Sequence, residues 1–494
     1  MTAVVFALIM ALSLGVAVLA RVGVRRMDIR QFLVGGRSFP PLMLFFLAVG
    51  EVYSIGTMLG FPGGIYSEGA GYGLWFLGYL LLAYPVGYFL APLVWRAAAR
   101  YDALTVPEVF GRHFRSRRLE VVIAIGSMIA LVPWGQFQFI GLQIVLGGLG
   151  LPISPFGAVL IAAAVAFVYV AVAGMRGSAF VALVKDVFML LGIVAVGVAA
   201  VLAAHGVPAL FARAAAVDPH PQLSGTALAF SVTTIVYQGF GFYLQPSVSP
   251  YVFPARSEAA VKSSTVFMPV YMLMYPFAVF AAYFAIGALP KSDDPNGVFL
   301  NLAHALLPSW LVGVVAAGAA LAGVLVLAAT SLNIGAIVTR NLVPRVPPTA
   351  QRRYTTAAVG LFLAVSAAMT TFSPALMLTV LNLSGYVGIQ FATGWLAIFF
   401  ARTVRPFAVG TGIVGGGLLA ITLYVTDARL GGINIGLVAL AVNLALTFGL
   451  SRLGPPGEPR RPVALTKGAD VPVHPDSSVA PAHRTPTAPT VTEP

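Results

Sequence analysis

The stretch Gly50-Glu-Val-Tyr-Ser-Ile-Gly56 places two glycines and three polar side chains inside an apolar run, residues 39–60. A run of about 20 apolar residues can cross a bilayer as a helix. Unwound backbone is tolerated at that depth only where it lines a cavity inside the protein. The run 226–247 carries a similar stretch, Tyr237-Gln-Gly-Phe-Gly-Phe-Tyr-Leu-Gln-Pro246. Glycines can also simply allow close helix packing, but the occurrence of this pattern in two separate runs favours two broken membrane helices.

The composition of the whole chain agrees with a membrane protein. Apolar residues make up 59% of the 494 residues and charged residues only 9%, whereas soluble proteins carry about 25% charged residues. Cysteine is absent, which excludes disulfides and thiolate metal sites. The formal net charge of +13 would suit a nucleic-acid partner, but the positions of the basic residues indicate a lipid bilayer instead. We expect an all-α membrane protein with no nucleic-acid partner.

Thirteen apolar runs are long enough to be transmembrane helices. The first has no basic segment before it and is followed directly by arginines, so we expect a retained span rather than a cleaved signal peptide. The runs are 2–20, 39–60, 72–95, 119–146, 154–175, 178–203, 226–247, 265–288, 308–338, 355–371, 375–400, 406–426 and 431–450.

Lysine and arginine are concentrated in alternate loops. With the 21–38 loop in the cytoplasm, all but four of the 29 basic residues fall on the cytoplasmic side. The exceptions are Arg213, Lys291 and Arg429 outside, and Lys185 within a span. The positive-inside rule therefore predicts a multi-pass protein of the cytoplasmic (inner) membrane, with its N-terminus outside and its C-terminus in the cytoplasm. Residues 454–494 are rich in Pro, Ala, Thr and Ser and are expected to form a disordered cytoplasmic tail.

Several motifs resemble those of the sodium:solute symporter family, over about residues 30 to 450. They are Phe32-Leu-Val-Gly-Gly-Arg-Ser38, Gly56-Thr-Met-Leu-Gly-Phe-Pro-Gly63, Leu104-Thr-Val-Pro-Glu108, Phe114-Arg-Ser-Arg117 and Gly174-Met-Arg176. Three further segments are most similar to the monocarboxylate permease branch of that family: Phe180-Val-Ala-Leu-Val-Lys-Asp186, Thr339-Arg-Asn341 and Gly432-Ile-Asn-Ile-Gly-Leu-Val438.

The resemblance implies a leucine-transporter-type core of two inverted five-helix repeats, in which the first helix of each repeat is broken around a midplane site. An extra helix and a basic cytoplasmic loop would occupy 1–38, and an extracellular loop would occupy 204–225. The repeats would span 39–203 and 226–400, followed by two C-terminal helices (401–453) and the tail (454–494).

The resemblance also implies a sodium site, but this chain departs from its pattern. In the family, carbonyls of the first core helix and two adjacent hydroxyl residues on the eighth core helix hold the ion. The carbonyl positions fall near Gly50 and Tyr53, and the hydroxyl positions fall on Leu325 and Val326, which cannot ligate a hard cation. Thr330 and Ser331 offer hydroxyls five residues later, where they would point about 140° away around the helix.

Three ionisable residues are expected within the membrane: Glu51, Lys185 and Asp186. Such residues are functional candidates by default. In proton-coupled transporters of this fold, a lysine on the fifth core helix resembles a substitute for sodium, so Lys185 favours proton coupling or an ion-independent carrier. Glu51 is expected to carry the proton or to be the partner of Lys185. The alternative for all three is a structural ion pair that holds the helices together.

The resemblance to the monocarboxylate branch predicts import of a small organic solute, an anion that helix N-termini and Lys185 would favour. The predicted substrate-binding residues are Ser54, Trp134, Gln138, Tyr237, Gln238 and Tyr243, although core packing would equally suit the aromatic ones. Of Gln136 and Gln138, at most one should line the cavity. The substrate could instead be neutral, such as proline or pantothenate.

Other classes of protein fit the sequence less well. A membrane sensor built on a symporter-like domain needs a signalling domain, and the tail is short. A channel needs a selectivity filter, and an enzyme needs a catalytic motif; neither is recognisable. We therefore expect a secondary active transporter that is not an enzyme. It is expected to have no cofactor beyond transported Na⁺ or H⁺, no transition-metal site and no obligate protein partner.

Overall fold

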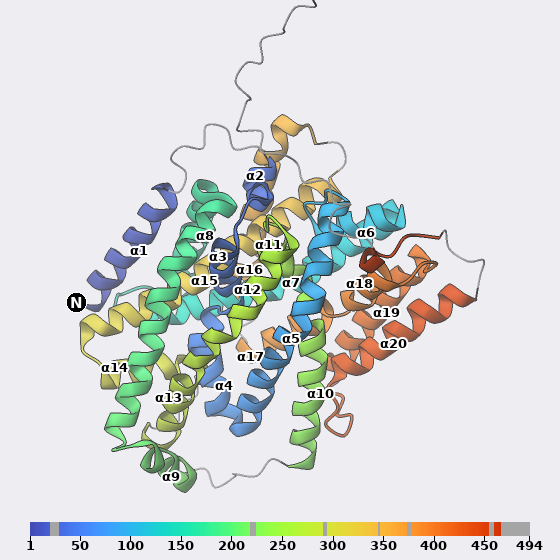
Figure 1. The fold of residues 1–494 in the computed structure, drawn as a ribbon. Helices are drawn as coiled ribbons and strands as arrows, with labels where there is room; N and C mark the ends of the chain where they lie inside the picture. The colour runs from blue at the N-terminus through green and yellow to red at the C-terminus, as the bar shows by residue number, and fades with distance from the viewer. Residues whose placement is uncertain are drawn as a thin grey trace, which may run out of the picture.

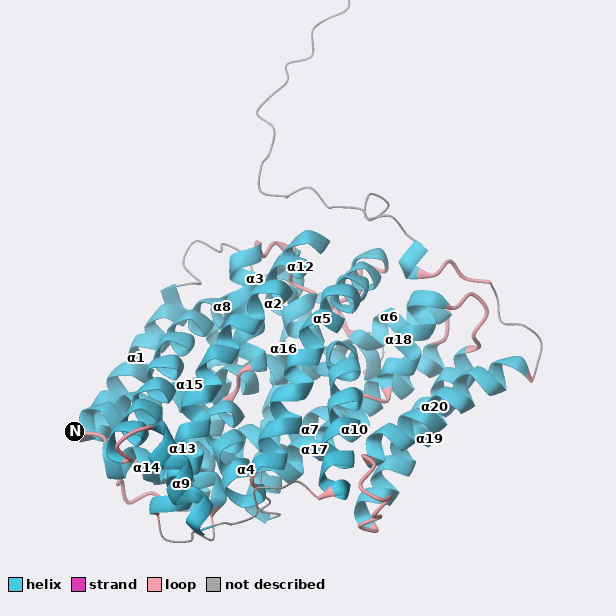
Figure 2. Cartoon of the chain, turned by 60° about the horizontal axis from the view of Figure 1, so that its bottom comes forward, coloured by secondary structure: helices cyan, strands magenta, loops and turns pink. Residues whose placement is uncertain are grey.

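The computed structural model describes residues 1–19, 29–217, 224–289, 294–343, 346–372, 377–453 and 459–465. Every regular element within these ranges is a helix (Figure 2). Eleven of the described helices are long and apolar enough to cross a bilayer, and one bent pair adds a twelfth. The runs 154–175 and 178–203, predicted as two spans, form one helix, α8 (Pro155–Ala203), of which Gly177–Ala203 is long enough to cross.

The helices form a single bundle, with α2 near one end and α9 at the other (Figure 1). The short helices are α2 (Ile29–Val34), α6 (Val106–Phe114), α9 (Val207–Val217), α11 (Ser249–Val252) and α14 (Val298–Leu306). The other helices are α1 (Thr2–Leu19), α3 (Pro41–Val52), α4 (Phe61–Glu68), α5 (Ala70–Arg100), α7 (Arg117–Gly147), α10 (Gly225–Gly241), α12 (Glu258–Phe267), α13 (Tyr275–Ala288), α15 (Ser309–Ile337), α16 (Pro348–Phe372), α17 (Met377–Gly388), α18 (Phe391–Phe400), α19 (Pro406–Val425) and α20 (Ile435–Arg452).

Helix α15 lies at the centre of the bundle. All of its residues from Val312 to Ile337 are buried, because α8, α7 and α1 pack around it. A helix that is apolar on all sides is expected in such a position. Small residues allow close packing: a Cβ atom on Gly318 would lie 2.8 Å from the backbone of Phe188 in α8. The glycine- and alanine-rich sequence of α15 therefore allows the neighbouring helices to pack closely against it.

The first predicted break lies between α3 and α4, whose axes are bent by 50°. Helix α3 ends at Val52, and Tyr53 has non-helical backbone angles (φ −94°, ψ 81°). Helical structure resumes with a π-helical turn, Gly56–Gly60. Ser54 supplies acceptors to the chain beyond the break, since its hydroxyl accepts from the Gly56 N–H (3.2 Å) and its carbonyl from the Thr57 N–H (3.0 Å). The polar residue within the apolar run thus stabilises the unwound backbone.

The second predicted break follows α10. The α-helix ends at Gly241, and two short 3₁₀ turns, Phe242–Leu244 and Pro246–Val248, lead into α11. Proline lacks the N–H that would continue the helix, which explains why the break includes Pro246. Both predicted broken helices are therefore present.

The motif Leu104-Thr-Val-Pro-Glu108 forms the start of α6. The Thr105 hydroxyl accepts from the Glu108 N–H (3.3 Å), and the Glu108 carboxylate accepts from the Leu104 N–H (2.9 Å). This arrangement resembles a capping box, which supplies partners to the free N–H groups at a helix start. Glu108 also pairs with Arg340 after α15, at 2.5 Å. The motif joins α6 to the end of the central helix.

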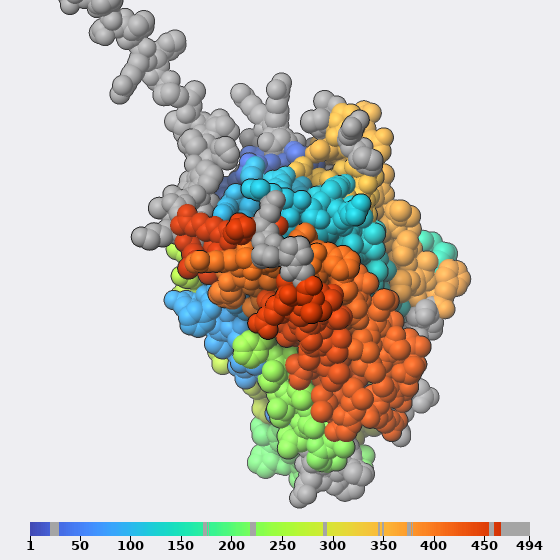
Figure 3. Space-filling model, turned by 90° about the vertical axis from the view of Figure 1, so that its right-hand side faces the viewer, coloured from blue at the N-terminus to red at the C-terminus, as the bar shows by residue number. Residues whose placement is uncertain are grey.

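Residues 459–465 are folded, so the prediction of a disordered tail is wrong for this segment. The Arg460 guanidinium donates to the carbonyl oxygens of Val404 (3.1 Å) and Phe114 (3.3 Å), and Val463 is fully buried. One arginine and one valine anchor a segment whose composition is typical of disorder. The segment lies beside α6 on the surface (Figure 3). Residues 454–458 and 466–494 of the predicted tail lie outside the described residues.

Candidate functional site

Helix α8 brings Lys185 to the break between α3 and α4. The Lys185 side chain is fully buried, and its Nζ donates to the backbone carbonyl oxygen of Tyr53 at 3.0 Å. The same ammonium lies 2.6 Å from the Asp186 carboxylate. A helix leaves its last carbonyls without backbone donors, and its C-terminal end favours a positive charge. The ammonium of Lys185 therefore occupies a position that suits a cation, at the end of α3.

Aromatic side chains enclose this ion pair. The ring of Tyr271 stacks on the ring of Tyr53 with centroids 5.5 Å apart. The Tyr53 hydroxyl in turn hydrogen-bonds Tyr84 and donates to the Met268 carbonyl at 3.2 Å. Lys185 and Asp186 are thus held in a protein interior that favours their remaining paired.

The face of α15 that approaches Gly50 carries no hydroxyl group at the contact. A Cβ atom on Gly50 would lie 2.7 Å from Leu325 Cδ2 and 3.0 Å from the Cβ of Ala182. Thr330 and Ser331 are buried further along α15, and the Ser331 hydroxyl donates to the Leu327 carbonyl of its own helix at 2.5 Å. Leu325, rather than the hydroxyl pair, is the α15 side chain in contact with Gly50.

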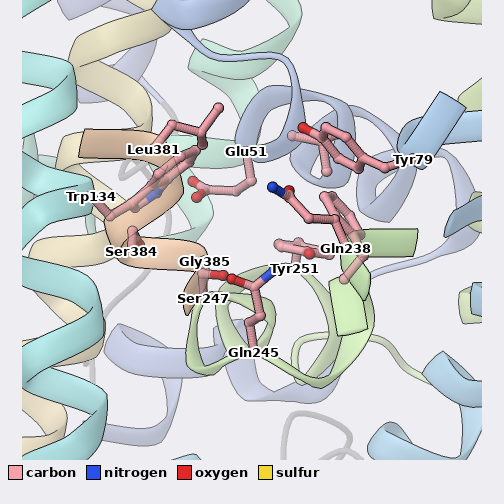
Figure 4. Close-up of a pocket in the computed structure, with 12 residues that line it drawn as sticks. Glu51, Tyr79, Trp134, Gln238, Gln245, Ser247, Tyr251, Leu381, Ser384 and Gly385 are labelled. Atoms are coloured by element: carbon pink, nitrogen blue, oxygen red, sulfur yellow. The ribbon is translucent and has the colours of Figure 1, made fainter. Parts of the chain in front are cut away.

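A cavity of about 70 Å³ lies next to the break. It is bounded by the end of α3, by α5, α7 and α10, by the second break and by α17. In Figure 4, Glu51 and Trp134 lie on one side, Gln238 lies on another, and the amide of Gln245 points into the space between them. The lining residues are Glu51, Val52, Tyr79, Trp134, Gln238, Phe242, Gln245, Ser247, Tyr251, Leu381, Ser384 and Gly385.

Two of the six predicted substrate-binding residues, Trp134 and Gln238, line this cavity. The other four are outside the lining and have partners elsewhere. The Tyr237 hydroxyl donates to the carbonyls of Gly385 (3.1 Å) and Tyr386 (3.2 Å), and the Tyr243 hydroxyl donates to the sulfur of Met268 (3.6 Å). The Gln138 amide donates to the Trp134 carbonyl (3.5 Å), and the Ser54 hydroxyl is used at the break.

Glu51 lines the cavity, although sequence reasoning assigned it to the cation site or to a pair with Lys185. Its side chain is only 5% exposed, and its Oε1 has no hydrogen-bond partner among the described residues. The ion pair of Lys185 is with the adjacent Asp186, and none within 4.0 Å joins Lys185 to Glu51 in the part of the chain that is described. Glu51 of α3 and Lys185 of α8 therefore belong to two different sites, which both lie at the end of α3.

Several cavity residues were missed by sequence reasoning. Gln245 and Ser247 lie within the second break and Tyr251 follows it in α11, so the proline at 246 and the polar residues around it were a usable signal. Ser384 and Gly385 come from α17, where no local pattern distinguishes a cavity residue from a packing one. Their place in the lining depends on how α17 lies against α7.

A helical bundle with two broken helices, a central cavity and a cation-suited carbonyl beside it defines a secondary transporter with a leucine-transporter-type fold. The model of the sodium:solute symporter family matches residues 32–415. The chain belongs to the sodium:solute symporter family.

The relatives of this chain are symporters and permeases. An uncharacterized symporter of Bacillus subtilis is 25% identical over 469 residues, which cover 90% of this chain and 95% of the relative. A monocarboxylate transport permease of Rhizobium johnstonii is 26% identical over 322 residues (63% and 64%). The sodium/pantothenate symporter of Escherichia coli is 23% identical over 433 residues (82% and 86%).

The fold is also that of a solved symporter. The substrate-bound, outward-open structure of a Na⁺-coupled sialic acid symporter matches with a TM-score of 0.75 over 92% of this chain and 98% of that chain, at 14% sequence identity. The chain is thus a multi-pass membrane protein and a solute:cation symporter, not an enzyme.

Proposed function

We propose that this symporter imports a small monocarboxylate together with protons, across the cytoplasmic membrane and by alternating access. The observation that carries the proton coupling is the hydrogen bond from the Lys185 ammonium to the Tyr53 carbonyl. A lysine at this point supplies a tethered positive charge where the family is expected to bind sodium. A bound sodium ion must enter and leave, whereas a lysine can gain and lose its charge by proton transfer.

The size and chemistry of the cavity support a small anionic substrate. A volume of about 70 Å³ holds roughly five water molecules, at ~10–15 Å³ each, so it suits a solute of a few heavy atoms better than pantothenate. The side-chain amides of Gln238 and Gln245 can donate hydrogen bonds to carboxylate oxygens. The name of the Rhizobium johnstonii relative, a monocarboxylate transport permease, points to the same class of solute.

The proposed orientation follows from the basic loops. Helices α2 and α6 and the segment 459–465 would lie on the cytoplasmic side, and α9 on the outer side. The positions of the basic residues support this arrangement, because lysine and arginine are retained on the cytoplasmic side during insertion.

The test is uptake of labelled acetate, lactate and pyruvate into proteoliposomes. We expect an imposed inward proton gradient to drive accumulation at symmetric sodium, and a protonophore to abolish it. An imposed sodium gradient at equal pH on both sides should drive none. Sodium-driven accumulation would overturn the proton coupling and assign the cation to oxygen ligands elsewhere on α15. Failure to take up any of the three acids would overturn the substrate class.

Two adjacent residues of α10 should separate substrate contact from packing. We expect Gln238→Ala to raise the KM for the transported acid about tenfold or more, since a hydrogen bond to a charged group contributes about 1.5–3 kcal/mol. Tyr237→Phe removes the bonds to α17 and should lower stability by about 1–2 kcal/mol with KM unchanged. Uptake kinetics and the melting temperature in detergent measure the two effects. An unchanged KM for Gln238→Ala would remove this residue from the substrate site.

A further inference from the structure

The carboxyl group of Glu51 is a buried acid that the role of Lys185 leaves unexplained. It lies in the last turn of α3, lines the cavity directly, and its Oε1 has no hydrogen-bond partner among the described residues. A buried carboxylate without a partner is costly. A group in such a position must be neutral or must acquire a partner during the transport cycle.

The groups that face Glu51 do not neutralise it. Tyr79 of α5, Trp134 of α7, Gln238 of α10 and Tyr251 of α11 surround the cavity, and none of its lining residues is basic. Lys185 of α8 is a cation that acts on Glu51 electrostatically, and it already lies 2.6 Å from the Asp186 carboxylate and bonds to Tyr53. The Lys185–Asp186 pair has no net charge. An ionised Glu51 would therefore leave one uncompensated negative charge in the cavity.

A substrate carboxylate would add a second negative charge to this space. Two carboxylates in a site of about 70 Å³ lie a few ångströms apart, where both cannot remain ionised; they share one proton instead. A shared proton gives a hydrogen bond between a carboxyl group and a carboxylate, which belongs to the strong, charge-assisted class. The amides of Gln238 and Gln245 can donate to the remaining oxygens.

We propose that Glu51 binds the substrate in its protonated form, donating its carboxyl hydrogen to the substrate carboxylate, so that one proton enters the cavity with each anion. On the cytoplasmic side the substrate leaves as an anion, and Glu51 releases its proton to water that enters the cavity. No covalent bond other than the O–H bond is broken. The inference rests on the proposed function, since it requires an anionic substrate, and it makes solute binding itself proton-dependent, separately from Lys185.

The direction of the pH effect follows from this scheme. The Kd for the substrate is lowest and constant below the pKa of the Glu51 carboxyl. Above that pKa it rises about tenfold for each pH unit, because the unbound protein must take up a proton to bind. Acetate, lactate and pyruvate stay anionic above about pH 5.5, so their own titration does not mask the effect. Glu51→Gln is a neutral donor of similar shape and cannot titrate.

The experiment is a binding assay with the purified full-length protein in detergent. Labelled acetate, lactate and pyruvate are each titrated at about pH 5.5, 6.5 and 7.5. For the acid that binds, we expect the wild-type Kd to rise with pH, and the Kd of Glu51→Gln to change less than about twofold over this range. Glu68→Gln, a matched change at an exposed acid in the other half of the same bent span, should behave as wild type.

Two outcomes would overturn the assignment. One is a Glu51→Gln variant whose Kd keeps the wild-type pH slope. The other is a Glu51→Gln variant that melts as wild type but binds nothing at any pH, since a neutral donor should suffice. If this variant does not fold, Glu51→Asp decides: a retained slope supports the proposal and a flat profile contradicts it. If wild type binds none of the acids, the proposed substrate class fails, and this inference fails with it.

Discussion

Replacing Lys185 with alanine is expected to reduce proton-driven uptake by about 100-fold or more. The substitution removes the ammonium that bonds the Tyr53 carbonyl and faces Asp186. Two charge-assisted contacts are lost at the break, each of about 1.5–3 kcal/mol, and about 1.4 kcal/mol corresponds to a factor of ten. The initial rate of uptake into proteoliposomes, at equal protein content and with an imposed proton gradient, measures the effect.

Lys262→Ala is the matched control. Lys262 pairs with Glu258 at 3.1 Å, but its side chain is 41% exposed, and exposed ion pairs contribute about 1 kcal/mol or less. We expect its uptake rate to stay within about twofold of wild type. A Lys185→Ala variant with a normal proton-driven rate would show that the buried lysine only supports packing.

Asp186→Asn is expected to lower the free energy of unfolding by about 3–5 kcal/mol. The substitution leaves the Lys185 ammonium buried without its counter-charge, and removing one partner of a buried pair is strongly destabilising. Thermal unfolding of the detergent-solubilised protein measures this effect. A melting temperature close to that of wild type would mean that the Lys185 charge is compensated by another group.

The double substitution Lys185→Met, Asp186→Leu separates a structural role from a transport role. Replacing both members of a buried ion pair by apolar residues is often neutral or stabilising, so we expect a melting temperature near that of wild type. Uptake should nevertheless remain as low as in Lys185→Ala. If this variant accumulates substrate normally in response to a proton gradient, the ion pair is structural and takes no part in coupling.

The end of α3 connects the two sites. Glu51 faces the cavity, and the carbonyl of Tyr53, two residues later, accepts from Lys185. Regular helical hydrogen bonding stops at the end of α3 and resumes with the turn Gly56–Gly60. A movement of this short segment would therefore alter both the cavity and the cation position. Under the proposed function, the break predicted from Gly50 to Gly56 would link solute binding to the cation position.

The membrane class, the two breaks and the placement of Lys185 within a span followed from the sequence. Apolar length and basic loops are local properties, and they predict spans without knowledge of tertiary contacts. Polar residues and glycine inside an apolar run likewise indicate a break. Ser54 stabilises this break locally, because its hydroxyl accepts a hydrogen bond from the Gly56 N–H. A lysine so deep in a span had to face the protein interior, because lipid exposure would be too costly.

Only the tertiary structure decided which partners these residues have. Lys185 meets Tyr53 from 132 positions away, and Glu51 turns toward the cavity, so that Asp186 rather than Glu51 pairs with the lysine. Tyr237 was predicted to bind substrate because tyrosine is common in binding pockets, yet its hydroxyl donates to backbone carbonyls of α17. The orientation of a side chain at a helix crossing depends on the rotation and packing of both helices. A single helix's sequence therefore gives the spacing of its polar groups, and the packed bundle determines which of them reach the substrate, the ion or the backbone.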